Sequence, residues 1–197
     1  MSTPREPRPG VLVLSILSAR WEAFWPGLAD DLAQRLGPLA SDSGLIPFEV
    51  TTYYQPEFGH PLWRRILSFE RPLPLDGLAD IKRFTNTLEL ARTESDGNRL
   101  FNLDPGCLTL ERLVLASGKN FTHRIYLGGG IWADLTLIYQ GGHWKTLPWT
   151  FRDYASPEVQ IHLTRLRDRY HQGILDETGP EAGDREAPSP DQSPHKE

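Results

Sequence analysis

Residues 11–36 read VLVLSILSARWEAFWPGLADDLAQRL, and this stretch indicates the fold class because it predicts the first two elements of the chain. Residues 11–18 form an almost continuous apolar run, which is typical of an inner β-strand. Residues 21–36 carry apolar side chains at helical spacing, and Gly37 and Pro38 follow them as a helix stop. The chain therefore opens with a strand and then a helix.

The next segments extend this beginning to six elements. Alternating side chains predict a second strand over residues 48–54, and residues 65–71 predict a third. Asp76 can cap a helix with a regular apolar face, and residues 99–103 then return as a short strand. Because this order is β-α-β-β-α-β, we expect an α+β fold with a ferredoxin-like core.

Three further parts extend that core. Thr109 can cap a short helix that ends at Gly118. A β-meander is expected over residues 122–147, with glycine turns between its strands. Ser156 and Pro157 then begin a terminal helix, for which Gly173 is the expected stop.

The glycine triplet at residues 128–130 fixes a strand register in this meander. If the three glycines form the loop, Arg124 lies opposite Asp134 and Tyr126 lies opposite Trp132. Two interpretations of the predicted Arg124–Asp134 ion pair are open. It can be a surface pair that contributes little to stability, or part of an aromatic-flanked anion site, because an arginine fork suits carboxylate and phosphate.

Charge and composition divide the 197 residues into three regions. We expect a flexible tail at residues 1–10, a single domain at 11–175 and a disordered acidic tail at 176–197. The acidic tail has no aromatic, Leu, Ile or Val, so it cannot bury enough surface to offset the entropy of ordering. It holds seven acidic and two basic residues, which leaves the rest of the chain neutral and argues against nucleic-acid binding.

Several classes of chemistry have no support in the sequence. Cys107 is the only cysteine, so no intramolecular disulfide is expected and a reducing cytoplasm is the natural compartment. The six histidines lack metal-ligand spacing, so no metal is expected and no cofactor is identified. The apolar run at 11–17 is too short to span a membrane and lacks a cleavage site. Whether the protein is an enzyme stays open.

Two groups of polar residues each allow two interpretations. Asn102 and Asp104 precede Pro105-Gly106, which predicts a turn; alternatively, both side chains project into a pocket. Lys82, Asn86 and Glu89 follow one another at helical spacing, which indicates either a solvated helix face or a polar surface shared with other residues.

Some strings are more particular than a hydrophobic core requires. They are Tyr53-Tyr54 with Glu57, Gly59 and Pro61-Leu62; Ala79 to Lys82 with Phe84 to Asn86; Asn102 to Gly106; His123 to Gly128; and Leu147 to Thr150 with Asp153-Tyr154. In this combination the chain resembles, over residues 6–170, domain of unknown function family 4416. The resemblance implies no established activity. A GTP-binding label carried by some members points to a nucleotide-like ligand, although this chain has neither a Walker loop nor an Asn-Lys-x-Asp motif.

Two functional hypotheses follow. The first is a polar pocket for a small phosphorylated or nucleotide-like ligand, in which lysine and arginine meet the anion, asparagines orient it, and tyrosines stack or donate. Its predicted residues are Tyr54, Lys82, Asn86, Asn102, Asp104, Arg124 and Tyr126. The second is a protein-interaction module without catalytic activity, because Trp and Tyr are favoured interface anchors. Its predicted residues are Trp63, Trp144, Trp149 and Tyr154.

Overall fold

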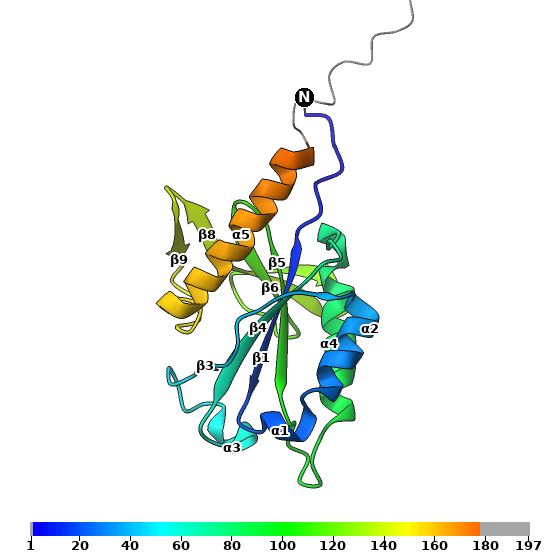
Figure 1. Cartoon of the computed structure of the whole chain (residues 1–197), viewed down its shortest axis with the longest axis vertical. Coiled ribbons are helices and arrows are strands. Elements are labelled where there is room, and N and C mark those ends of the chain that lie inside the picture. Colours follow the sequence, from blue (N-terminus) through cyan, green and yellow to red (C-terminus); the bar gives the residue numbers. More distant parts are fainter. Residues whose placement is uncertain (1, 178–197) are drawn as a thin grey trace, which may run out of the picture.

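The structure is a computed structural model, and it describes residues 2–177 (Figure 1). The elements in chain order are β1 (Val11–Ser18), α1 (Trp21–Phe24), α2 (Gly27–Leu36), β2 (Leu39–Asp42), β3 (Ile46–Pro47), α3 (Gln55–Phe58), β4 (Trp63–Phe69), the 3-10 turn η1 (Leu75–Gly77), α4 (Leu78–Ala91), β5 (Asn102–Leu108), β6 (Arg112–Ser117), β7 (Arg124–Gly128), β8 (Ile131–Gln140), β9 (His143–Thr146) and α5 (Pro157–Glu177).

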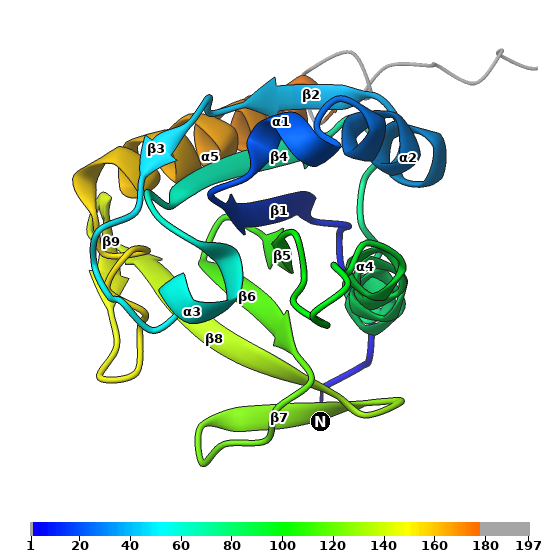
Figure 2. The ribbon, with the colours of Figure 1, turned by 90° about the horizontal axis from the view of Figure 1, so that it is seen from below.

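One antiparallel sheet contains all nine strands of residues 2–177. Its order is β2-β4-β1-β5-β6-β8-β7, with β3 also beside β4 and β9 also beside β8. Seen from below, the sheet bends between β5 and β8, and β7 lies at the end opposite to β2 (Figure 2). The α+β class is confirmed. The ferredoxin-like arrangement is not confirmed, because the strands that were expected to form it continue into this larger, meander-like sheet.

Two hydrophobic cores lie on the two faces of the sheet, because side chains alternate along its strands. On β1, Leu12, Leu14 and Ile16 join the core under α1, α2 and α4, whereas Val13 joins the core under α5. The helices contribute fully or nearly fully buried side chains at helical spacing. These are Leu28, Leu32 and Leu36 from α2, and Val159, Leu163 and Leu166 from α5. Each such side chain contributes about 1.5–3 kcal/mol of burial free energy.

The strand expected over residues 48–54 is wrong. These residues form a loop before α3, and Phe48 packs with Leu17, Phe58 and Leu62 in a third, small core. The apolar residues that indicated a strand therefore pack in this small core at the end of the sheet, and they do not pair with a neighbouring strand. The position beside β4 is occupied instead by β2 and β3.

The short helix expected between Thr109 and Gly118 is also wrong, because residues 112–117 form β6. The amide of Thr109 donates to the carbonyl of Arg112 at 2.9 Å, which makes a tight turn between β5 and β6. The turn expected at residues 104–106 lies inside β5. Gly106 is needed there for close strand packing, since a Cβ would lie 3.0 Å from the carbonyl oxygen of Val114.

Several boundaries differ from the expected ones. The helix expected over residues 21–36 is divided in two around Pro26, which has no amide hydrogen to donate. Asp76 belongs to η1 and does not cap α4 with its side chain. Gly173 does not end α5, which extends to Glu177, so the first two residues of the expected tail are helical. Residues 178–197, which make up the rest of that tail, lie outside the described part of the chain.

The remaining elements agree more closely with the sequence. β1 has the expected bounds, the meander of β7, β8 and β9 is confirmed, and β4 lies two residues earlier than expected. None of the helices within residues 2–177 combines the length and the apolar character needed to cross a membrane.

Candidate functional site

The site begins where two neighbouring strands separate. β5 pairs with β1 from Asn102 to Leu108, but it pairs with β6 only from Gly106 onward. Pro105, at the point of separation, has no amide hydrogen for a ladder bond. Among the described residues, β6 therefore leaves the first half of one edge of β5 open.

Helix α4 supplies the missing bonds to this open edge. The ammonium of Lys82 donates to the carbonyl of Leu103 at 2.6 Å, and Oε1 of Glu89 accepts from the Leu103 amide at 2.6 Å. Both residues are buried: the exposed fraction is 6% for Lys82 and 5% for Glu89. The backbone of Leu103 is thus satisfied by two side chains instead of by a neighbouring strand, and the gap between β5 and β6 stays open.

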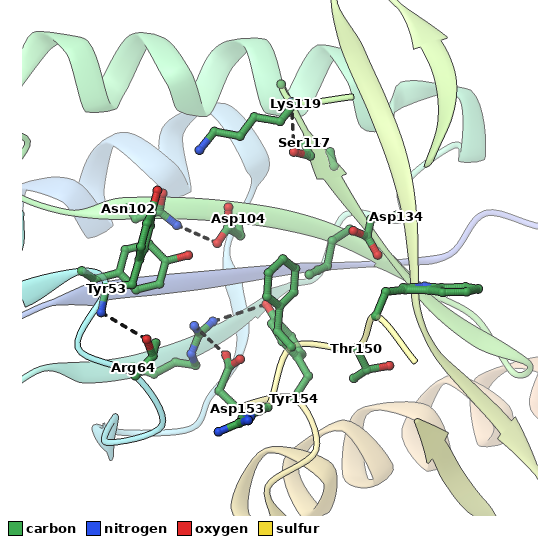
Figure 3. Close-up of a pocket in the computed structure, with 18 of the residues that line it drawn as sticks. Tyr53, Arg64, Asn102, Asp104, Ser117, Lys119, Asp134, Thr150, Asp153 and Tyr154 are labelled. Atoms are coloured by element: carbon green, nitrogen blue, oxygen red, sulfur yellow. Dashed lines mark hydrogen bonds and ion pairs between the residues drawn. The ribbon is translucent and has the colours of Figure 1, made fainter. Parts of the chain in front are cut away.

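A cavity of about 1090 Å³ occupies the gap. Its wall includes β5, α4, the end of β6 and the segment 148–154, as the close-up shows (Figure 3). Its volume is slightly above the range typical for small-molecule sites, which is roughly 300–1,000 Å³.

The first polar group in the wall is centred on Arg99. Its guanidinium binds Glu57 with two bonds of 2.6 and 2.9 Å, and a third bond of 2.6 Å reaches Glu89. The hydrogen bond from Arg99 lowers the pKa of Glu57. The pKa of Glu89 is raised because its burial outweighs the attraction of Lys82. This group attaches the short helix α3 to α4.

Beside it, two polar side chains extend from β5 into the cavity. Nδ2 of Asn102 donates to Oδ2 of Asp104 at 2.6 Å, and the other oxygen of Asp104 lies 3.5 Å from the Lys82 ammonium. Burial, aided by the negative charge of Asp104, raises the pKa of Tyr54 to about 12. The Tyr54 phenol is therefore a hydrogen-bond donor at neutral pH.

The floor contains a buried arginine. Arg64 is 5% exposed, and its Nη2 lies 2.6 Å from Oδ2 of Asp153. Its Nη1 donates to Ser15 and to the hydroxyl of Tyr154. The rings of Phe48 and Tyr154 lie 5.2 and 5.1 Å from the guanidinium carbon. These contacts of the Arg64 guanidinium fix the side chains at the bottom of the cavity in one arrangement.

The third group lies at the β7 end. Nε of Arg124 donates to Asp134 at 2.9 Å, while its Nη1 binds Ser117 and the carbonyl of Lys119 at 2.9 and 2.8 Å. The predicted pairings of Arg124 with Asp134 and of Tyr126 with Trp132 are confirmed, and so is the ion pair. The three-glycine loop is wrong, because Gly128 belongs to β7 and pairs with Ile131 after a bulge. Asp134 is 2% exposed, so the pair is buried and the surface-pair interpretation is wrong. Arg124 connects three parts of the cavity wall.

The structure brings six of the seven predicted ligand-binding residues to the cavity. They are Tyr54, Lys82, Asn86, Asn102, Asp104 and Arg124. Tyr126 does not line it, because this residue is 55% exposed on β7 and packs against Trp132. Lys82 is not on a solvated helix face, since Leu103 and Asp104 surround its ammonium.

Other lining residues were missed from the sequence. Arg64 could have been noticed as a charge within the apolar strand β4, whereas Glu57 and Arg99 meet only through the fold. Of the residues predicted for a protein interface, Trp144 and Tyr154 are buried in the α5 core, and Trp149 lines the cavity.

Within residues 2–177, no cluster of three or more His, Cys, Asp or Glu side chains is arranged to hold a metal ion. The fold and the cavity together describe an α+β protein with a preformed polar site. The model of the domain of unknown function DUF4416 matches residues 8–170, so the chain belongs to this family. No curated protein and no solved structure matched the chain.

Proposed function

We propose that this protein binds a small phosphorylated or nucleotide-like ligand in the cavity between β5 and β6. The observation that carries the proposal is that the cavity wall has two cationic side chains without a carboxylate partner in the described part of the chain. Every carboxylate that lines the cavity has a cationic partner. The ion pairs are Glu57–Arg99, Glu89–Arg99, Asp104–Lys82, Asp134–Arg124 and Asp153–Arg64. Two lining cations, Lys119 and Arg152, have no ion-pair partner among residues 2–177.

The unpaired ammonium of Lys119 is well placed for an anion. Its positive charge contributes to the lowered pKa of Glu57, which comes from α3 on another part of the wall. Figure 3 shows its side chain running toward the side where Asn102 and Asp104 lie. A phosphate bound there would meet a cation that needs no existing ion pair to be broken.

Neutral donors complete the set. Asn86 is half-buried in the wall. Neither its side-chain amide nor the Tyr54 hydroxyl has a hydrogen-bond partner within the described residues. Small-molecule sites typically combine such a few polar groups with apolar and aromatic walls. Here the aromatic part includes Tyr53, Trp149 and Phe151.

The test is a thermal-shift measurement on the full chain with inorganic phosphate, sugar phosphates and nucleotides. Ligand at 100 times its Kd stabilises the native state by about 2.7 kcal/mol. We expect at least one phosphate compound to raise Tm, and we expect Lys119→Ala to weaken that effect without changing the Tm of the free protein. Lys145→Ala is the control, because Lys145 is exposed on β9 and outside the cavity wall. A panel without any shift would contradict the proposal.

Arg124 is a poor probe of binding. Removing its side chain would leave the buried carboxylate of Asp134 without its guanidinium partner, and breaking a buried pair in this way costs about 3–5 kcal/mol. Lys119 carries no such structural role.

A protein partner is the second candidate function, and one observation favours it. Strand β7 lies at the edge of the sheet, and its consecutive residues Ile125, Tyr126 and Leu127 are 72%, 55% and 40% exposed. Adjacent exposed apolar side chains on a strand edge favour pairing with another chain. The discriminating experiment is a pull-down with wild type and Ile125→Lys, in which a partner retained equally by both would rule out β7 as its docking site.

A further inference from the structure

We propose that the ligand carries a planar ring and that this ring stacks on Trp149. The inference rests on the proposed function and narrows its ligand class, because a flat ring joined to a phosphate describes a nucleotide rather than a sugar phosphate.

One face of the Trp149 indole is covered, and the other is the candidate stacking surface. Its indole is stacked on the imidazole of His123, with ring centroids 4.6 Å apart and an interplanar angle of 8°. Trp149 lines the cavity but His123 does not, so His123 covers the face that points away from the cavity. Trp149 as a whole is nevertheless 36% exposed. A large aromatic face turned to a cavity is a stacking surface that accepts any flat π-system.

The ring is held in place before any ligand arrives. Its Nε1 donates to the carbonyl of Leu135 at 2.8 Å. The hydroxyl of the next residue, Thr150, donates to the carbonyl of Thr136 at 2.6 Å and accepts from the amide of Leu147 at 2.8 Å. These bonds attach the segment that carries Trp149 to β8, so stacking costs little additional ordering.

The support behind the ring is equally fixed. Nε2 of His123 lies 3.2 Å from Oδ2 of Asp134, the same oxygen that accepts from Nε of Arg124. Arg124 in turn donates to the carbonyl of Lys119. A single hydrogen-bonded network therefore joins the imidazole behind Trp149 to the backbone of Lys119, the residue that carries the unpaired ammonium. Such a connection suits one ligand with a ring at one end and an anion at the other.

The experiment compares binding of AMP, GMP, CMP and UMP with binding of ribose 5-phosphate, which has the same sugar and phosphate but no planar base. Calorimetric titrations use the full chain. Stacking of one base contributes an amount equivalent to roughly 5- to 150-fold in affinity. We expect at least one nucleotide to bind tighter than ribose 5-phosphate by such a factor. Trp149→Leu should remove this advantage, whereas Trp149→Phe should keep most of it.

The two substitutions separate stacking from structure, since both remove the bond to Leu135 but only Phe keeps a flat ring. Tyr126→Leu is the control, because Tyr126 is exposed and outside the cavity wall. Ribose 5-phosphate binding as tightly as every nucleotide would contradict the stacking surface and leave the proposed function intact. Equal losses for Trp149→Leu and Trp149→Phe would also contradict it. If none of the five compounds binds, this inference fails, and a thermal-shift panel that is also without any shift makes the proposed function fail with it.

Discussion

Glu89→Ala tests whether α4 holds open the edge of β5. Wild-type Glu89 accepts from the buried amide of Leu103 and from Arg99, both at 2.6 Å. A buried donor without a partner costs about 1–3 kcal/mol, and a lost hydrogen bond to a charged group costs about 1.5–3 kcal/mol. Relief from burying the carboxylate offsets part of this sum, because burial is the cause of its raised pKa. We expect the free energy of unfolding to fall by about 3 kcal/mol.

The assay is urea unfolding followed by tryptophan fluorescence. In thermal unfolding of a chain of this length, the same loss of about 3 kcal/mol corresponds to a decrease in Tm of about 6–12 °C. Glu89→Gln should cost only about 1 kcal/mol, because the amide oxygen still accepts from Leu103. Asp80→Ala is the control on the same helix, since its ion pair with Arg83 is exposed and such pairs contribute at most about 1 kcal/mol. Equal losses for Glu89→Ala and Asp80→Ala would refute the reasoning.

Two further predictions concern other parts of the fold. Burial and the nearby Arg165 lower the pKa of His162 below its ordinary value of 6.5, so its stabilising effect is complete above pH 6.5 and is lost as the pH falls through the folded-state pKa. Between pH 7.5 and 5, wild type should therefore lose more stability than His162→Gln in urea unfolding; equal losses would be the contrary result. Gly106→Ala should destabilise by about 1–3 kcal/mol through overpacking, whereas Gly118→Ala, with nothing near its Cβ, should change the urea midpoint little.

The sequence predicted best what depends on local patterns. Side-chain alternation and the glycine turn placed Arg124 opposite Asp134, because strand register has a period of two residues and the turn leaves few alternatives. The start of α5 at Ser156 and Pro157 followed from capping rules, and the Ser156 hydroxyl accepts from the amide of Val159.

Other features depend on contacts between residues distant in the sequence. Residues 112–117 are a short apolar run that fits a helix or a strand, and pairing with β8 decides for the strand. The helical spacing of Lys82 and Glu89 indicated a polar face, but it could not show that this face meets the backbone of Leu103. For the candidate site, the pocket interpretation of Asn102 and Asp104 matched their position in the wall although the turn expected beside them was wrong.

The attachment of α4 to β5 also has a consequence for the order of folding. An uncovered strand edge is a template for the strands of other molecules, and so a route to aggregation. Lys82 and Glu89 are only 21 and 14 residues from Leu103, whereas the partners of β5 on β1 are about 90 residues away in the chain. Because short loops close faster than long ones, we expect α4 to cover this edge before β5 joins the sheet. The edge that the finished fold leaves unpaired would then not be exposed during folding.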